Sequence, residues 1–475
     1  MNAQAAPKAQ EPKLEPAIIV IFGITGDLSR RYLLPSLYHL MKDNLLHDKT
    51  RIVGITRGNM SPKELLDQTK MCGQDNENVC DPKALQQMQA NTTIMHMDLI
   101  NQADYIELHK QLDDIESKEG VCMNRLYYLS IPPQVYTPVI RLLDEAGLNT
   151  SCQHGRAMTR LLVEKPFGFS LSSAEELIAT TEHVFREEQV FRIDHYLAKE
   201  TVQNILTFRF RNPIFESLWD RHHIASITIN AYQKIGIEGR AVFYEPLGAL
   251  RDFIQSHLLQ ILAIVTMDRP KEFTSEQIHL SKQALMRHIE PIPADQVGKR
   301  TRRGQYEGYR EEVNNQHSTT ETYAEIKVFI NNSRWQNVPI YLSTGKALSE
   351  RKTEVCIDFY GKEGEMMNRL RFRIQPNEGI ELDLLTKRPG FRDEVNQTAM
   401  DFSYQHDFEN HGHPDAYERV LVDAVRGDHT LFATSEEVLA SWRVIQPALD
   451  EWSKRNDDLF FYERGATDIE ASSQL

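Results

Sequence analysis

The sequence predicts two domains: an α/β domain with a doubly wound parallel sheet, followed by an α+β domain with a large, mainly antiparallel sheet and helices. A chain of 475 residues is too long for one ordinary core. Short apolar runs alternate with helical patterns to about residue 190, whereas period-2 alternation dominates after residue 220. We therefore divide the chain into a flexible polar tail (1–16), a first domain (17–193) and a second domain (194–475).

The first domain begins with Ala17–Phe22 (AIIVIF), a continuous apolar run typical of a parallel strand buried on both faces. A helical pattern follows, and Pro35 within it should bend the helix or delay its start. Arg51–Thr56 (RIVGIT) is predicted to be a second buried strand, which completes a right-handed βαβ unit.

The alternation continues with apolar runs at 95–98, 126–130 and 161–163 and helix-like stretches at 103–115 and 136–146. Ser173 and Glu176 have the spacing of a capping box and predict the start of another helix. The first domain is therefore expected to be Rossmann-like.

In the second domain, apolar and polar residues alternate at 227–232, 324–330, 355–359, 370–374 and 380–384. This is typical of antiparallel strands with one solvent-exposed face. An apolar helix at 247–267 lies between the first two of these strands, and helices near 413–426 and 435–452 close the chain. Arg369, Arg371 and Arg373 share one face of a predicted strand, which we interpret as a solvated face or a subunit contact.

The net charge of −14 argues against nucleic acid or an anionic membrane as a partner. The N-terminus lacks the apolar segment of a secretory signal, and no stretch is apolar enough for a membrane helix, so we expect a cytoplasmic protein. The five cysteines have no metal-ligand spacing, and we expect no metal site. Reduced thiols are the favoured interpretation, although Cys72 and Cys80 could form a redox pair.

A glycine-containing turn lies between the first strand and the first helix, and it includes Gly23, Thr25, Gly26, Asp27 and Leu28. Glycines there allow the backbone to approach a pyrophosphate at the helix N-terminus. The spacing is G-x-x-G and not G-x-G-x-x-G, so a simple loop is the alternative. Its position after the first buried strand favours a dinucleotide site.

The end of the second strand carries Arg57 and no acidic residue. NAD enzymes usually place Asp or Glu there, whereas a guanidinium fits the 2′-phosphate of NADP. A solvated surface arginine is the alternative. NADP is therefore the expected cofactor, and NAD stays possible.

Two polar motifs lie where the two domain patterns meet. VEKPFG contains Lys165, and RIDHYLAKE contains Asp194, His195, Tyr196 and Lys199. Histidine, tyrosine and lysine can all donate to a phosphate. A polar interdomain strand without a ligand is the alternative interpretation.

A polar island interrupts the apolar helix at 251–260 and contains Asp252, Gln255 and His257. One histidine on an apolar helix is more often a core residue than a catalyst, but its polar neighbours favour a functional site. Asp252 and His257 are five residues apart, so they should not share one stripe of an α-helix. To act on one ligand, both side chains would have to reach it from the same end of the helix.

Seven motifs in order, VEKPFG, RIDHYLAKETVQN, GIEGRAVFYE, RDFIQSHLLQ, RGQY, STGKALSERK and RIQPNEG, resemble the glucose-6-phosphate dehydrogenase family. The resemblance covers nearly the whole chain. It implies oxidation of D-glucose 6-phosphate at C1 to 6-phospho-D-glucono-1,5-lactone with reduction of NADP, the entry to the pentose phosphate pathway. It also implies that the chain is a homodimer or homotetramer.

The resemblance further implies that His257 is the general base and that Asp194 holds its imidazole. It places Lys165 between cofactor and substrate, with Thr25 and Arg57 at the NADP 2′-phosphate. The residues implied to bind the substrate are Lys165, His195, Tyr196, Lys199, Gln233, Asp252 and Lys346.

Five residues depart from the pattern of that family, and the two small changes among them, Ala198 for a usual glycine and Ser256 for a usual asparagine, are expected to be harmless. Tyr32 stands where a substrate-side lysine is usual, and Gln233 stands where a glutamate usually contacts sugar hydroxyls. Gln233 keeps an acceptor but loses charge, so we expect a raised KM for glucose 6-phosphate or an altered sugar preference. Ser343, in place of an arginine, leaves a second, structural NADP site open.

Two other functions are considered. The chain could oxidise another hexose or hexose phosphate, because E-K-P after a strand also occurs in inositol dehydrogenase-like enzymes. An uncharged sugar, however, would leave Lys199 without a charged ligand. The chain could also be a non-catalytic regulatory paralogue, but a protein that only binds needs no general base.

Overall fold

The computed structural model describes residues 12–69, 71, 80–150, 157–361, 368–407 and 414–467. The chain forms two compact units. Unit 1 comprises Met1–Lys165, Leu177–His195 and Pro414–Phe432. Unit 2 comprises Pro166–Glu176, Tyr196–His413 and Ala433–Leu475. A segment from near the C-terminus thus belongs to unit 1, which the order of patterns along the chain does not reveal.

Unit 1 is built on a seven-stranded sheet with the order β15-β6-β5-β4-β1-β2-β3. Strands β1 to β6 pair in parallel, and four of them are fully buried, which explains the apolar runs within them, although β4, β5 and β6 each also contain a buried arginine. Without β15, this is the strand order of a Rossmann fold, and the predicted class is confirmed. The strands are β1 (Ala17–Phe22), β2 (Arg51–Thr56), β3 (Thr92–His96), β4 (Asn124–Leu129), β5 (Thr159–Val163), β6 (Val190–Ile193) and β15 (Phe432–Ala433).

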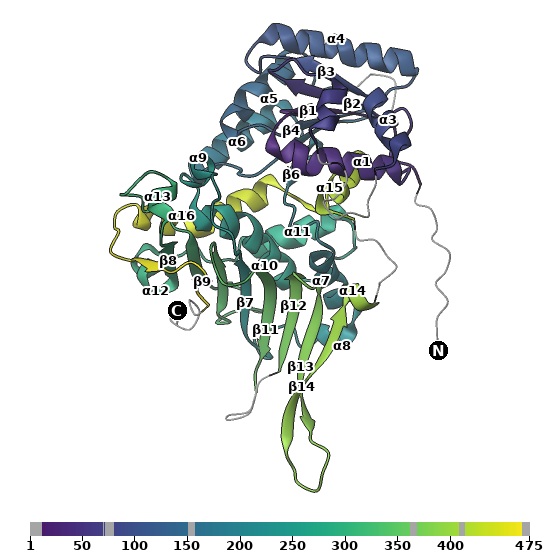
Figure 1. Cartoon of the computed structure of the whole chain (residues 1–475). Coiled ribbons are helices and arrows are strands. Elements are labelled where there is room, and N and C mark those ends of the chain that lie inside the picture. The colour runs from purple at the N-terminus through teal and green to yellow at the C-terminus, as the bar shows by residue number, and fades with distance from the viewer. Residues whose placement is uncertain are drawn as a thin grey trace, which may run out of the picture. The chain divides into compact units, whose positions relative to one another are not determined.

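The helices of unit 1 pack around this sheet: α4 and α5 are neighbours, and α1 contacts α3 and α15 (Figure 1). Pro35 lies in the first turn of α1, but the chain is already helical before it, from Asp27 through η1, so the proline does not delay the start of helical structure. The helical segments are η1 (Ser29–Leu33), α1 (Leu34–Lys42), α2 (Pro62–Asp67), α3 (Pro82–Asn91), α4 (Gln102–Glu119), η2 (Pro133–Val135), α5 (Tyr136–Glu145), η3 (Glu187–Gln189) and α15 (Ala416–Arg426).

Two local expectations are wrong. Strand β3 occupies Thr92–His96 and not 95–98, because this edge strand includes partly exposed polar residues that an apolar run misses. Ser173 does not form the predicted N-cap, because α6 (Leu171–Val184) begins two residues earlier. The N–H of Ser170 donates to Ser173 Oγ at 2.9 Å, and that of Ser173 donates to Ser170 Oγ at 3.3 Å.

The predicted tail lies only partly within the described residues, since 1–11 are outside them. Lys13 forms an ion pair with Asp48 at 2.7 Å, and Leu14 is buried and donates its N–H to Leu45 O at 2.8 Å. These contacts attach residues 13 and 14 to unit 1.

The cysteines also differ from the expectation of reduced thiols. Cys80 takes part in a disulfide and Cys122 also takes part in a disulfide, whereas Cys356 is a buried free thiol. Cysteine spacing alone did not show this, because disulfides depend on contacts in space. Cys72, the other half of the suggested redox pair, lies outside the described residues.

Unit 2 contains a nine-stranded sheet with the order β14-β13-β12-β11-β7-β10-β9-β8-β16. Most pairs are antiparallel, but β10 runs parallel to β7 and β16 runs parallel to β8. The β13–β14 hairpin extends well beyond the neighbouring strands (Figure 1). The strands are β7 (Ile224–Tyr232), β8 (Thr301–Tyr306), β9 (Tyr323–Val328), β10 (Ile340–Gly345), β11 (Lys352–Phe359), β12 (Arg369–Gln375), β13 (Gly379–Lys387), β14 (Val395–Ser403) and β16 (Leu459–Tyr462).

The predicted class of the second domain is confirmed, but the sequence patterns missed β8, β10, β14 and β16. Strand β10 is central yet carries buried polar residues: Ser343 Oγ donates to Asn230 Oδ1, and Thr344 Oγ1 donates to Ala231 O, both at 2.7 Å. Because these hydroxyls form hydrogen bonds inside the protein, the two polar residues can be buried at little cost. The strand therefore lacks the apolar pattern by which a buried strand is recognised in the sequence. Strand β14 is exposed along most of its length, so it shows no alternation.

The apolar helix predicted at 247–267 is present as two segments, the π-helix η4 (Leu250–Leu258) and α10 (Leu259–Thr266). Segment η4 contacts β7, β9, β10 and α16, so it lies between the sheet and the last helix. The other helical segments are α7 (Glu200–Arg211), α8 (Pro213–Glu216), α9 (Ala241–Tyr244), α11 (Ser275–Met286), η5 (Ala294–Gln296), α12 (Val297–Arg300), α13 (Tyr309–Glu312), α14 (Tyr404–Asp407) and α16 (Ser435–Trp452).

Candidate active site

The glycine turn of unit 1 lies at the carboxyl end of β1, beside the carboxyl end of β4. In the 3-2-1-4-5-6 order, this is the point where the strand order reverses and where ligands bind. Gly23 has φ +80°, and a Cβ there would lie 2.3 Å from Ser130 O. Only glycine fits this position, so Gly23 is what allows the turn to pack closely against the residue that follows β4. Ser29 Oγ fixes the turn by donating to Gly23 O at 3.1 Å, and it can accept from Ser130 Oγ, which lies 2.9 Å away.

The turn also reaches the end of β2. The hydroxyls of Thr25 and Thr56 lie 3.3 Å apart, and Thr56 Oγ1 accepts the N–H of Gly58. Arg57, which lies between Thr56 and Gly58 in the sequence, is exposed. The structure thus brings Thr25 and Arg57 to the same edge of the sheet, as the sequence predicted. Asp27 instead pairs with Arg31 on the surface at 2.7 Å.

Lys165 and Asp194 follow β5 and β6, so they lie at the same carboxyl edge of the sheet as Gly23. Lys165 is half-buried and Asp194 is buried. Glu164, between β5 and Lys165, accepts a hydrogen bond from Tyr128 OH at 2.5 Å. The pKa of Glu164 is raised to about 7, chiefly because the carboxyl is buried; Tyr128 and Lys165 oppose this rise, and the nearby Asp194 adds to it.

His195 lies next to an aromatic residue that the sequence did not identify. Tyr417 on α15 stacks on His195 with ring centroids 6.3 Å apart and planes 12° apart. The ring of Tyr417 also stacks on that of Tyr32, with centroids 5.0 Å apart. A contact of 2.7 Å between His39 Nδ1 and Glu418 Oε1 links α1 to α15. The helix periodicity near 413–426 predicted this helix, but not its place in unit 1.

In unit 2, Tyr196 and Lys199 are joined through Gln375, the last residue of β12. Gln375 Nε2 donates to Tyr196 OH at 3.0 Å, and Gln375 Oε1 accepts from Lys199 Nζ at 2.8 Å. Arg351 Nη2 donates to the same Oε1 at 3.2 Å. Two cations therefore converge on one amide oxygen, directly before the N-terminus of α7. This combination suits an anion. Gln375 and Arg351 lie in two quoted motifs, but sequence reasoning had given them no role.

His257 is fully buried on the π-helix η4, with its ring 4.6 Å from that of Tyr196 and 5.2 Å from that of Phe253. A π-helix hydrogen-bonds residues five apart, and such residues therefore stack on the same face. The expectation that Asp252 and His257 lie on different stripes assumed an α-helix and is wrong. The wider turn brings both side chains to one face.

Lys346, which follows β10, lies close to Asp252. Its Nζ is 3.7 Å from Asp252 Oδ2 and donates to Gln233 Oε1. The rings of Tyr244 and Phe253 lie 5.0 and 6.0 Å from the ammonium group. Unit 2 therefore brings together the six predicted residues that belong to it: Tyr196, Lys199, Gln233, Asp252, His257 and Lys346. Asp194 belongs to unit 1, so its pairing with His257 stays a prediction.

The arginine row of β12 is engaged with carboxylates. Arg369 pairs with Asp358 at 2.6 Å, and Arg371 and Arg373 both pair with Glu381. This neutralisation agrees with a solvated face and gives no support to an anion site. In the described part of the chain, no three His, Cys, Asp or Glu side chains are placed to hold a metal ion. Nor does that part contain a helix of the length and apolarity needed to cross a bilayer.

Comparison with known proteins covers both units. Residues 20–204 match the family model "Glucose-6-phosphate dehydrogenase, NAD binding domain", and residues 206–475 match "Glucose-6-phosphate dehydrogenase, C-terminal domain". The glucose-6-phosphate 1-dehydrogenase of Chlamydia muridarum is 38% identical over 469 residues, covering 93% of this chain and 92% of that protein. The Dictyostelium discoideum protein of the same name is 36% identical, covering 96% and 93%.

Solved structures agree. A glucose-6-phosphate dehydrogenase in complex with glucose 6-phosphate has a TM-score of 0.88 and 32% identity, and each chain covers 97% of the other. The Mycobacterium avium glucose-6-phosphate 1-dehydrogenase has a TM-score of 0.82 and 31% identity, covering 96% and 95%. A levoglucosan dehydrogenase with NADH, only 9% identical at a TM-score of 0.52, shares the fold alone. The chain belongs to the glucose-6-phosphate dehydrogenase family, in both of its domains.

Proposed function

We propose that this chain oxidises D-glucose 6-phosphate at C1 to 6-phospho-D-glucono-1,5-lactone, with NADP as the hydride acceptor. The observation that carries this proposal is the position of His257 on a π-helix face that it shares with Asp252, beside Lys346 and the Lys199–Arg351 pair. This arrangement offers a base, hydroxyl-binding groups and an anion site within one unit.

His257 takes the proton of the C1 hydroxyl as general base, which leaves the electrons of that O–H bond to form the C1=O bond of the lactone. The C1–H bond breaks at the same time, and its electron pair leaves with the hydrogen as hydride. Asp194 holds the imidazole in position and stabilises its cation. Bound NADP supplies the nicotinamide that accepts the hydride.

The phosphate of the substrate is held by His195, Tyr196 and Lys199, and we include Arg351 in this proposed set because its guanidinium donates to the same Gln375 oxygen as Lys199. When the phosphate binds, it takes the place of the neutral amide oxygen as the acceptor for both cations. Asp252, Gln233, Lys346 and Lys165 contact the sugar hydroxyls.

The residues of unit 1 fit a dinucleotide. Gly23 lets the turn pack closely against Ser130 at the carboxyl edge of the sheet, which is the edge where a pyrophosphate binds in this strand order. Gly26, Asp27 and Leu28 complete the turn. Arg57 is exposed beside Thr25 and Thr56, and no acidic residue stands at the end of β2 to prefer a ribose 2′-hydroxyl. These features support NADP over NAD.

The test is NADPH formation at 340 nm by the pure protein. Glucose 6-phosphate, other hexose 6-phosphates and free glucose are compared, each with NADP and with NAD. We expect the highest kcat/KM for glucose 6-phosphate with NADP. His257→Asn should lower kcat by about 10²–10⁴-fold, and His288→Asn, at an exposed histidine of the same unit, should change nothing. A folded protein that forms no NADPH would instead be a regulatory paralogue, and a preference for free glucose would contradict the phosphate site.

The Asp194–His257 pair has its own test. If the carboxylate acts through the imidazole, Asp194→Asn and His257→Asn should be strongly non-additive in kcat. Independent, additive effects would contradict the pairing. We also propose a cytoplasmic homodimer or homotetramer, which light scattering and cell fractionation can check.

A further inference from the structure

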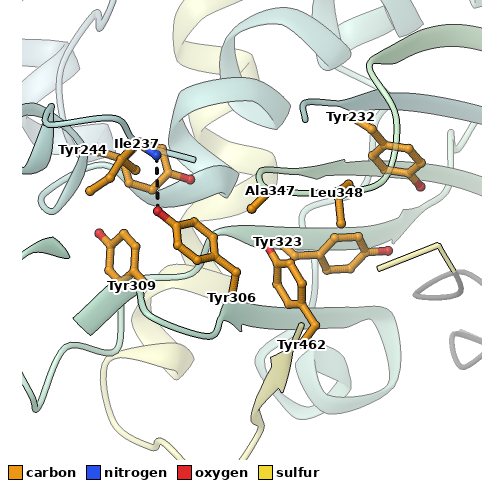
Figure 2. Packing of buried hydrophobic residues seen from close by; sticks show 9 residues of the cluster. All are labelled: Tyr232, Ile237, Tyr244, Tyr306, Tyr309, Tyr323, Ala347, Leu348 and Tyr462. Carbon is orange, nitrogen blue, oxygen red and sulfur yellow. Dashed lines mark hydrogen bonds between the residues drawn. The ribbon is translucent and has the colours of Figure 1, made fainter. Parts of the chain in front are cut away.

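A cluster of buried tyrosines surrounds the loop that follows Lys346. Figure 2 shows six of them, together with Ile237, Ala347 and Leu348. The cluster draws on segments far apart in the sequence, among them the last strand, β16. The tyrosines are Tyr232, Tyr244, Tyr306, Tyr309, Tyr323 and Tyr462. Buried hydroxyls need partners, so where each hydroxyl binds shows which part of the backbone it holds.

Tyr462 of β16 binds the backbone of Lys346 itself. Its hydroxyl lies 2.8 Å from Lys346 O and 2.8 Å from Thr322 Oγ1. A carbonyl oxygen can only accept, so Tyr462 donates to Lys346, and Thr322 must donate to Tyr462. Thr322 also accepts the Lys346 N–H on its carbonyl oxygen at 2.9 Å. Both backbone polar groups of Lys346 are therefore fixed.

The next residue, Ala347, is held in a conformation that needs support. Its φ of +52° is left-handed, which is unfavourable for a residue with a Cβ. Its N–H donates to Ile235 O at 2.9 Å, and its carbonyl accepts the N–H of Gly465 at 2.7 Å. Ser349 N donates to Ala466 O at 3.1 Å. The segment 462–466 thus supplies three hydrogen bonds to residues 346–349.

The side chain of Lys346 has little freedom to compensate for a backbone shift. It is only 6% exposed, and its ammonium lies among Gln233, Asp252 and the rings of Tyr244 and Phe253. A rotation of the left-handed turn would move the Lys346 Cα–Cβ bond and withdraw the ammonium from these groups.

We propose that Tyr462 is a positioning residue for the sugar-binding ammonium of Lys346, so that the C-terminal segment of the chain sets the affinity for the hexose phosphate. The inference rests on the proposed function, because it takes Lys346 as a substrate contact. Tyr462 itself lies behind the loop and acts through the Lys346 carbonyl.

Tyr462→Phe in the full chain tests this, because it removes the hydroxyl and keeps the ring. We expect KM for glucose 6-phosphate to rise about fivefold, as for the loss of one hydrogen bond, with kcat and KM for NADP unchanged. Tyr309→Phe is the matched control: this tyrosine is equally buried in the cluster, but its hydroxyl donates to Glu245 at 2.6 Å. Tyr309→Phe should lower Tm about as much as Tyr462→Phe does, and it should leave KM for glucose 6-phosphate unchanged.

A double-mutant cycle separates positioning from a general loss of stability. Lys346→Met should raise KM strongly, and adding Tyr462→Phe to it should raise KM no further. An unchanged KM in Tyr462→Phe, or additive effects in the double variant, overturns the inference and leaves the proposed function intact. If Lys346→Met itself leaves KM unchanged, both the inference and the assignment of Lys346 to the substrate are wrong.

Discussion

A buried ion cluster between α11 and α16 predicts a large loss of stability in one variant, Glu437→Gln. Glu437 is fully buried, and its two oxygens accept from His279 Nδ1 and Lys282 Nζ, both at 2.9 Å. The same side chain completes a capping box with Thr434 at the start of α16. Because α16 also packs on η4 through Gln255 and Ser441, this cluster supports the element that carries His257.

The magnitude follows from two independent arguments. Although burial opposes ionisation, Lys282 and His279 lower the pKa of Glu437 from 4.5 to about 2. That difference is worth about 3 kcal/mol at neutral pH. Removing one partner of a buried pair costs about 3–5 kcal/mol, because it leaves the other charge uncompensated. The stabilisation is complete above pH 4.5 and is lost as the pH falls from 4.5 towards 2.

The assay is thermal unfolding at pH 7 of the wild type, Glu437→Gln and a matched control. We expect Glu437→Gln to lower Tm by roughly 6–12 °C. Glu436→Gln is the control, since the neighbouring Glu436 pairs with Arg287 on the surface, where a pair contributes about 0–1 kcal/mol. Equal melting temperatures for the two variants would refute the reasoning, as would a destabilisation that persists unchanged at pH 2.

Three further predictions concern the site. Gly23→Ala should weaken NADPH binding at least tenfold in a fluorescence titration, because its Cβ would lie 2.3 Å from Ser130 O in a left-handed turn; unchanged affinity would contradict the placement of the pyrophosphate. Glu164 has a pKa raised to about 7, so its burial destabilises the fold increasingly as the pH rises from 4.5 through 7. Glu164→Gln should therefore reduce the loss of Tm between pH 5 and pH 8, and an identical pH profile would show that the carboxyl does not titrate there. Gln233→Glu should give Lys346 a charged partner and the sugar a stronger acceptor, so it should lower KM for glucose 6-phosphate several-fold; an unchanged kcat/KM across hexose phosphates would exclude this role.

The sequence predicted a strand correctly where a single physical rule determines the residue pattern of that strand. Strands β1 and β2 were found with their observed bounds, because strands buried on both faces require continuous apolar runs. Strand β10 was missed because Ser343 and Thr344 are buried with partners that only the folded sheet provides. Strand β14 was missed because exposure on both faces leaves no pattern to find.

Sequence motifs identified more of the site residues than the spacing of residues along a helix did. Lys199 was identified in its motif, but Arg351 and Gln375 were not, because only the pairing of β11 with β12 and the approach of α7 bring them together. Tyr417 was missed because α15 joins unit 1 from a distance of more than 200 residues along the chain. The spacing of Asp252 and His257 led to a wrong expectation, because an α-helix was assumed where the structure has a π-helix.

Because η4 is a π-helix, the number of residues in this part of the chain should matter for function. Surface loops tolerate added or lost residues, but deletion of Leu250 or Arg251 would let the segment relax to ordinary α-helical winding while Asp252 and His257 stay five residues apart. Five residues then span about 1.4 turns, so the carboxylate and the imidazole would point about 140° apart. Homologous enzymes that keep this chemistry should therefore vary in the composition of the segment far more freely than in its number of residues.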